Sequence, residues 1–162
     1  MGNIFIREAV SGDAELLLEF VRALAEYEHL EDQVEATVEG LRQTIFTDKR
    51  ADALIAEYDG QAAGFALFFH NYSTFKGKPG LYLEDLFVKP ELRGKGVGRA
   101  LLRNLAALAA RRGCGRLEWA CLDWNTPSIA FYKSIGAIPL SDWTMFRVTE
   151  EKLSALAKLT IG

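Results

Sequence analysis

A strand, a glycine-rich loop and a long helix follow one another between residues 81 and 112, and this run constrains the fold most. Residues 81–88 are mostly apolar and stop before a proline, as a buried strand does. The loop carries three alternating glycines, which are Gly94, Gly96 and Gly98. Leucines and alanines then recur at helical spacing over 98–112, and a further strand-like run follows at 116–122. This order predicts a right-handed crossover between two strands.

The remaining elements predict a sheet around that crossover. Apolar runs indicate strands at residues 3–8, 53–58, 62–72 and 144–148. Helical periodicity indicates helices at residues 13–28, 37–46, 127–135 and 149–160. Asp59-Gly60 is a hairpin signal between two of the strands, and a polar loop at 73–80 precedes the next one. We therefore expect a mixed α/β (α+β) domain with an antiparallel part.

Length and composition exclude several classes of protein. The chain has 162 residues, 49% of them hydrophobic, so we expect a single domain over 1–162 with its own core. The net charge of −3 argues against a nucleic-acid partner, because such domains carry a basic excess. The chain has no signal-peptide pattern and no apolar run of the roughly 18 residues that a membrane span needs.

The cysteines and histidines indicate no metal or redox site. Cys114 and Cys121 fit no zinc or redox spacing, so we expect reduced thiols in a cytoplasmic protein. His29 and His70 lie in separate predicted elements and form no recognisable metal site or triad.

The glycine loop has the features of an anion-binding site. Glycine lets backbone N–H groups approach a ligand closely, and the following helix directs its positive dipole end at the loop. Arg93, Lys95 and Arg99 add positive charge. The P-loop and the dinucleotide-binding pattern both require glycine at position 99, where this chain has arginine. On these residues alone, a phosphate-binding loop and a flexible basic loop both remain open.

The loop Arg93-Gly94-Lys95-Gly96-Val97-Gly98 resembles the Arg/Gln-x-x-Gly-x-Gly/Ala loop of the GNAT superfamily of N-acetyltransferases. Its setting, between a strand ending in Leu86-Phe87-Val88 and a long helix, matches as well. The resemblance implies a mostly antiparallel, twisted central sheet flanked by helices, with acetyl-CoA as the cofactor. It implies that the loop holds the cofactor's pyrophosphate, and that the strand is splayed from its neighbour so that its N–H groups face the acetyl carbonyl and pantetheine. The cofactor-binding residues implied are Leu86, Phe87, Val88, Arg93, Gly94, Lys95, Gly96, Val97, Gly98, Arg99, Asn125, Ser128 and Tyr132.

Three further segments are similar to the diamine (spermidine/spermine-type) acetyltransferases. They are residues 24–28, 82–88 and 124–133, which follow the same order and spacing over nearly the whole chain. Near relatives in that branch acetylate other small amines, including thialysine-like amino acids. The resemblance therefore implies a primary amine of a small molecule as acceptor. It also implies a homodimer, and we expect residues 144–161 to form part of its interface.

Tyr132 is the candidate general acid. Acetyl transfer from a thioester to an amine requires donors for the oxyanion and a proton for the departing thiolate. A phenol, whose ordinary pKa is about 10, can protonate a thiolate with a modest uphill step. The resemblance places the acid tyrosine of the family in this helix. An aromatic ring that packs the helix onto the sheet is the alternative.

Glu84 is the candidate base and is expected to act through water. A lysine-like amine, whose pKa is about 10.4, is almost wholly protonated at neutral pH and must lose a proton before it attacks. Glu84 and Asp85 are adjacent, so on a regular strand they point to opposite faces and only one faces the cleft. The resemblance selects Glu84. A solvent-facing charge on an edge strand is the alternative.

The amine pocket is expected around the acidic stretch 26–32, where carboxylates surround one aromatic ring. The substrate-binding residues implied by the resemblance are Tyr27, Glu28, Glu84, Glu118, Trp119 and Ala120. A solvated helix end also explains the acidic stretch. Asn125 suits a helix cap or a turn, and the resemblance adds a contact to the pantetheine arm, as it does for Ser128.

Three functions remain open. The first is direct acetyl transfer to a small amine in a ternary complex, since neither cysteine is placed to carry an acyl group. The second is the same chemistry on a protein or peptide. The third is a non-catalytic acyl-CoA-binding module, against which Tyr132 and Glu84 argue.

Overall fold

The computed structural model describes residues 2–160. The chain divides into two compact units, Met1–Ala120 and Cys121–Gly162, which we describe separately. None of the helices within the described residues has the length and apolar character to cross a membrane.

The first unit is built on a five-stranded sheet in the order β1-β2-β3-β4-β5. The strands are β1 (Ile4–Glu8), β2 (Asp52–Tyr58), β3 (Gln61–Ser73), β4 (Lys78–Val88) and β5 (Leu117–Trp119). The pairs β1–β2, β2–β3 and β3–β4 are antiparallel, and β4–β5 is parallel. The predicted mixed sheet with a crossover after β4 is thereby confirmed.

The hairpin between β2 and β3 forms at the predicted dipeptide. Asp59 and Gly60 have φ values of 51° and 79°. Two central residues with positive φ are characteristic of a type I′ turn, whose twist matches that of the flanking strands.

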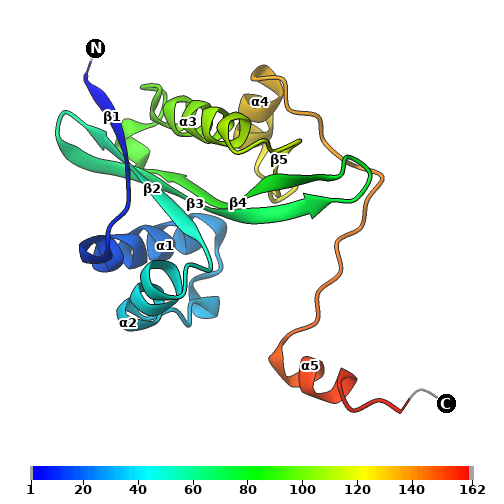
Figure 1. The fold of residues 1–162 in the computed structure, drawn as a ribbon. Coiled ribbons are helices and arrows are strands. Elements are labelled where there is room, and N and C mark those ends of the chain that lie inside the picture. The colour runs from blue at the N-terminus through cyan, green and yellow to red at the C-terminus, as the bar shows by residue number, and fades with distance from the viewer. Residues whose placement is uncertain (1, 161–162) are drawn as a thin grey trace. The chain divides into compact units, whose positions relative to one another are not determined.

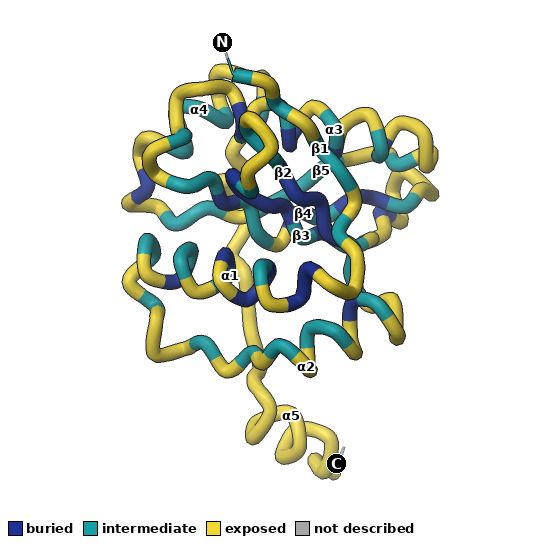
Figure 2. Tube along the Cα trace, turned by 90° about the vertical axis from the view of Figure 1, so that its left-hand side faces the viewer, coloured by how far each residue is buried: buried dark blue, intermediate teal, exposed yellow. Residues whose placement is uncertain are grey.

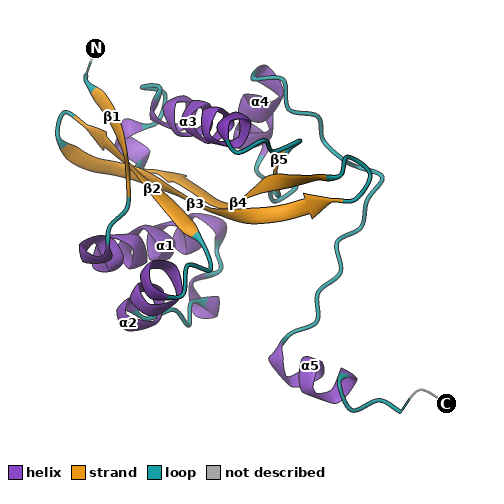
Figure 3. Ribbon diagram, viewed as in Figure 1, coloured by secondary structure: helices purple, strands orange, loops and turns teal. Residues whose placement is uncertain are grey.

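Helices cover both faces of this sheet (Figures 1 and 3). On one face lie α1 (Ala14–Glu28) and α2 (Val38–Leu41), and α2 continues as the π-helix η3 (Arg42–Thr47). On the other face lies α3 (Val97–Arg111). Single 3₁₀ turns occupy η1 (Ser11–Asp13), η2 (Glu31–Gln33) and η4 (Pro90–Leu92).

Two apolar layers hold the helices to the sheet, and Figure 2 shows the buried residues concentrated in the strands between them. Under α1, Phe20 stacks on Phe65 with ring centroids 5.5 Å apart and meets Phe87 at 6.0 Å. Under α3, Leu101 and Leu105 are fully buried. Burying a side chain of this size contributes about 1.5–3 kcal/mol, so these layers fix the helices on both faces.

The start of α1 is anchored by an ion pair. Arg7 on β1 donates two hydrogen bonds to Asp13, at 2.7 and 2.9 Å, and a third to Glu57 on β2 at 2.8 Å. Its hydrogen bonds hold the pKa of the Asp13 carboxyl below the ordinary value. This contact sets where α1 begins and thereby helps to place its far end.

The second unit contains α4 (Thr126–Ser134) and α5 (Glu150–Leu156). The strand predicted at 144–148 is wrong, because this stretch has no regular structure, and the predicted helix at 149–160 is shorter. The observed boundaries of two strands in the first unit also differ from the predicted ones. β4 begins at Lys78, within the predicted loop, and β5 covers only part of residues 116–122.

Candidate functional site

The glycine loop presents the amino end of a long helix. Gly94 and Gly96 have φ values of 75° and 91°, which side chains with a Cβ rarely adopt. Gly96 is the N-cap of α3, and no side chain caps the helix there. The first N–H groups of this 15-residue helix therefore remain available to an anion. This geometry fits the diphosphate of a coenzyme.

The cationic side chains of the loop take different directions. Lys95 places its Nζ 5.3 Å from the ring centroid of Tyr58. Arg93 instead places its Cζ 4.4 Å from the ring centroid of Tyr27 at the end of α1. Arg99 is exposed in the first turn of α3.

One edge of β4 is covered over only part of its length. β5 pairs with β4 as far as Leu83 and no further. Lys89 donates its N–H to Ala63 on β3. Since successive strand residues alternate between the two edges, the N–H groups of Leu86 and Val88 point away from β3, towards the uncovered edge.

Phe87 differs from its two neighbours. By the same alternation its backbone faces β3, and its side chain is only 4% exposed in the core under α1. Of the three predicted residues of this segment, Leu86 and Val88 therefore have the backbone direction that suits a cofactor, whereas Phe87 supports the segment from within the core.

A β-bulge interrupts β4 at Glu84. Leu83 pairs with Phe68, and Asp85 pairs with the adjacent Leu67, so Glu84 is an extra residue without a register partner on β3.

The bulge brings two carboxylates to one face of the sheet. Phe87 and its partner Phe65 belong to the core under α1, and alternation places Asp85 on the same face. Leu83, before the bulge, lies on the opposite face, so Glu84 points towards α1 as well. The expectation that Glu84 and Asp85 point to opposite faces is therefore wrong, because β4 is not a regular strand at this point.

Asp85 is the carboxylate that this environment perturbs most. Burial, and then the negative charges of Glu84 and Glu28, raise its pKa to about 6. Burial also raises the pKa of Glu28. Asp85 is not among the site residues expected from the sequence. The sequence does carry a signal for it, since the apolar alternation of β4 skips one position between Leu83 and Leu86.

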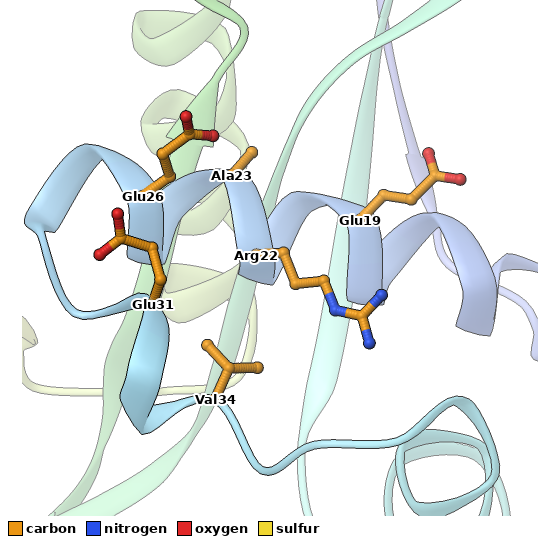
Figure 4. A pocket seen from close by; sticks show the side chains of 6 residues that line it. All are labelled: Glu19, Arg22, Ala23, Glu26, Glu31 and Val34. Atoms are coloured by element: carbon orange, nitrogen blue, oxygen red, sulfur yellow. The ribbon is translucent and has the colours of Figure 1, made fainter.

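The acidic stretch at the end of α1 separates into two groups. Tyr27 and Glu28 are half-buried, and α1 ends at Glu28 because His29 adopts the left-handed conformation. Glu26 and Glu31 belong instead to an open groove on the solvent side of α1 (Figure 4). The groove is lined by Glu19, Arg22, Ala23, Glu26, Glu31 and Val34. Tyr27 and Glu28, the two residues of this stretch that are predicted to contact the amine, thus do not line this groove.

Glu118 and Trp119 lie on β5, and Ala120 follows its last residue. Glu118 accepts a hydrogen bond from Asn71 on β3 at 3.3 Å, and Arg116 lies 3.9 Å from the same carboxylate oxygen. The Glu118 carboxylate therefore already has two partners, one on β3 and one next to the start of β5.

The second unit carries the remaining predicted residues. Asn125 is the N-cap of α4 and accepts a hydrogen bond from the Ser128 N–H at 3.4 Å, so the helix-cap interpretation is confirmed. Tyr132 is half-buried on the same helix, with its ring 5.5 Å from that of Phe131.

A family model described as "Acetyltransferase (GNAT) family" matches residues 15–137. Thialysine N-epsilon-acetyltransferase of Bos taurus is 39% identical over 97% of this chain and 99% of its own length. L-ornithine N5-acetyltransferase NATA1 of Arabidopsis thaliana is 40% identical over 74% of this chain and 50% of its own length. Among solved structures, an integron cassette protein from the mobile metagenome of V. cholerae aligns with a TM-score of 0.79 and 27% identity, over 96% of this chain and 98% of the other.

Proposed function

The chain belongs to the GNAT acetyltransferase family, and we propose that it transfers the acetyl group of acetyl-CoA to a primary amine of a small diamine or lysine-like molecule. The observation that carries this proposal is the bulge in β4. It brings Glu84 and Asp85 to the sheet face under α1, where the charge of Glu28 also acts on Asp85. A group of carboxylates beside a tyrosine ring suits a cationic amine.

The cofactor is proposed to bind along the uncovered edge of β4 and the start of α3. The N–H groups of Leu86 and Val88 would hold the pantetheine arm and the acetyl carbonyl, whose oxygen gains negative charge during attack. The N–H groups at Gly96–Gly98, with the nearby cationic side chains, would hold the pyrophosphate. The cofactor supplies the acetyl thioester, and the chain binds and orients it.

The proton transfers are assigned to two side chains. Glu84 accepts the proton of the amine through a water molecule, which leaves a nitrogen lone pair for attack on the thioester carbon. As the C–N bond forms and the C–S bond breaks, Tyr132 donates its phenolic proton to the sulfur. The second proton that the nitrogen loses on becoming an amide returns to Tyr132 through solvent. We propose direct transfer, with no acyl group carried on the chain. We also propose that residues 1–162 act as a single acetyltransferase domain.

The amine is proposed to lie along the α1 face of β4. Tyr27 and Glu28 would contact its distal ammonium group, and Glu84 the nitrogen that reacts. The names of the relatives support small amines, since they refer to thialysine and L-ornithine. Glu118, Trp119 and Ala120 are also proposed to contact the amine. Asn125 and Ser128 are proposed to contact the pantetheine arm.

We also propose a homodimer that uses residues 144–161, of which Ile161 lies outside the described residues. Met145, Phe146 and Leu159 are 68%, 89% and 67% exposed, and apolar exposure on this scale is typical of protein–protein interfaces. Light scattering after size exclusion gives the mass directly, and a monomer would contradict this part of the proposal. A cytoplasmic location is also proposed, in line with the absence of a disulfide between Cys114 and Cys121.

A thiol-release assay tests the function. The chain is incubated with acetyl-CoA and with a panel of polyamines, short diamines, lysine analogues and peptides. We expect release of coenzyme A thiol with small amines and not with peptides. Activity on peptides alone would favour a protein acetyltransferase. A tight complex with coenzyme A that is inert towards every amine would indicate a binding module.

A further inference from the structure

The side chain of Arg93 connects the glycine loop with the residues assigned to the amine. Its Cζ lies 4.4 Å from the ring centroid of Tyr27, at the end of α1. Its Nε donates a hydrogen bond to the carbonyl oxygen of Val88 at 3.0 Å, on the uncovered edge of β4. One guanidinium group therefore contacts an element of each proposed substrate site.

The contact with Tyr27 competes with the amine, whereas the cofactor competes with Tyr27 for the guanidinium group of Arg93. The ring of Tyr27 already receives one cation, and a second cation cannot occupy the same face, where the two charges would also repel each other. The pyrophosphate of the cofactor offers Arg93 a stronger partner, because a guanidinium binds phosphate oxygens through charge-assisted, often bidentate hydrogen bonds.

We propose that Arg93 couples the binding of the two substrates. Binding of the cofactor draws the guanidinium of Arg93 from Tyr27 to the pyrophosphate, and the ring face then becomes available to an ammonium group of the amine. This inference rests on the function proposed above. Because coupling between two ligands is reciprocal, the amine tightens the binding of coenzyme A by the same factor.

The expected coupling is modest. A cation over an exposed aromatic ring gains an amount that corresponds to roughly a two- to five-fold change in a binding constant. Coenzyme A should therefore tighten the binding of the amine by about two- to five-fold. Coenzyme A without its acetyl group is the suitable probe, because no turnover occurs.

Isothermal titration of the full chain with the best acceptor from the amine panel, with and without coenzyme A, tests the coupling. In Arg93→Gln the amine should bind two- to five-fold more tightly than to the wild type when coenzyme A is absent, and coenzyme A should then give little further gain. Lys95→Gln is the matched control, since it removes the same charge from the same loop but its side chain lies over Tyr58. It should weaken the binding of coenzyme A, while the affinity for the amine in the absence of coenzyme A stays unchanged.

Two results would overturn the inference. One is an Arg93→Gln variant that binds the amine no better than the wild type without coenzyme A, which would reduce Arg93 to a pyrophosphate ligand. The other is an equal gain in Lys95→Gln, which would reveal a general effect of charge. A wild type that acetylates no amine would instead contradict the proposed function, so the two failures are distinguishable.

Discussion

Replacing Asp85 with asparagine should stabilise the folded protein at neutral pH. In the wild type, burial and two nearby carboxylates raise the pKa of Asp85 from 3.8 to about 6. The folded state thus resists ionisation of this group. Asparagine has nearly the same shape as the protonated acid and carries no charge, so the variant avoids the cost of a buried negative charge at pH 7.5.

The magnitude follows from the pKa. A difference of about two pKa units, each corresponding to about 1.4 kcal/mol, gives a gain in unfolding free energy of up to about 3 kcal/mol. The size of this gain depends on pH. A raised carboxyl pKa makes the wild type relatively more stable at low pH, and this stability is lost as the pH rises through about 6. The advantage of Asp85→Asn should therefore be small near pH 4, grow through pH 6 and be complete above pH 7.

Urea unfolding between pH 4 and pH 8 measures this difference. In a chain of this length, a gain of this size corresponds to a rise in Tm of roughly 6–12 °C at pH 7.5. Glu19→Gln is the control, because it removes an exposed charge from the solvent side of α1 that does not act on Asp85, and it should change the stability by about 0.5 kcal/mol or less. An Asp85→Asn variant with no gain at pH 7.5, or with an equal gain at pH 4, would refute the reasoning.

Three further substitutions test other parts of the molecule. Tyr132→Phe should lower turnover by about ten-fold or more while coenzyme A still binds in a titration, and unaltered turnover would remove Tyr132 from the acid role. Gly96→Ala should weaken the binding of coenzyme A and destabilise the fold by about 1 kcal/mol, because φ is positive at this position. Gly98→Ala should be tolerated, since its Cβ would meet Val88 only at 3.7 Å. Equal effects of the two substitutions on the affinity for coenzyme A, measured by calorimetry, would contradict this. Gly64→Ala should destabilise the protein by about 1–3 kcal/mol in urea unfolding, because a Cβ there collides with the carbonyl oxygen of Phe87.

Features that depend on local chemistry could be predicted from the sequence. The turn at Asp59-Gly60, the helix starting near Gly98 and the cap at Asn125 each follow from residues within a few positions of one another. The glycine loop is of the same kind, since its positive φ values are a property of glycine itself.

Features that depend on distant partners could not be predicted. The run at 144–148 has the composition of a strand, yet a strand also needs a neighbour with free backbone groups, which periodicity does not reveal. The bulge at Glu84 is a matter of register between β3 and β4. The contact between Arg93 and Tyr27 joins residues that lie far apart in the sequence.

The bulge in β4 also limits how the length of this strand can change during evolution. Deletion of one residue at Glu84 would make Leu83 and Asp85 consecutive, and they already pair with the consecutive residues Phe68 and Leu67. The ladder would become regular, and the residues from Asp85 to the glycine loop would keep their partners and their faces. Phe87 would stay in its core, and one carboxylate would be lost. A one-residue insertion between Asp85 and Val88 would instead exchange the faces of the residues on one side of it. We therefore expect the length of this strand to vary at the bulge and to stay constant from Asp85 to the glycine loop.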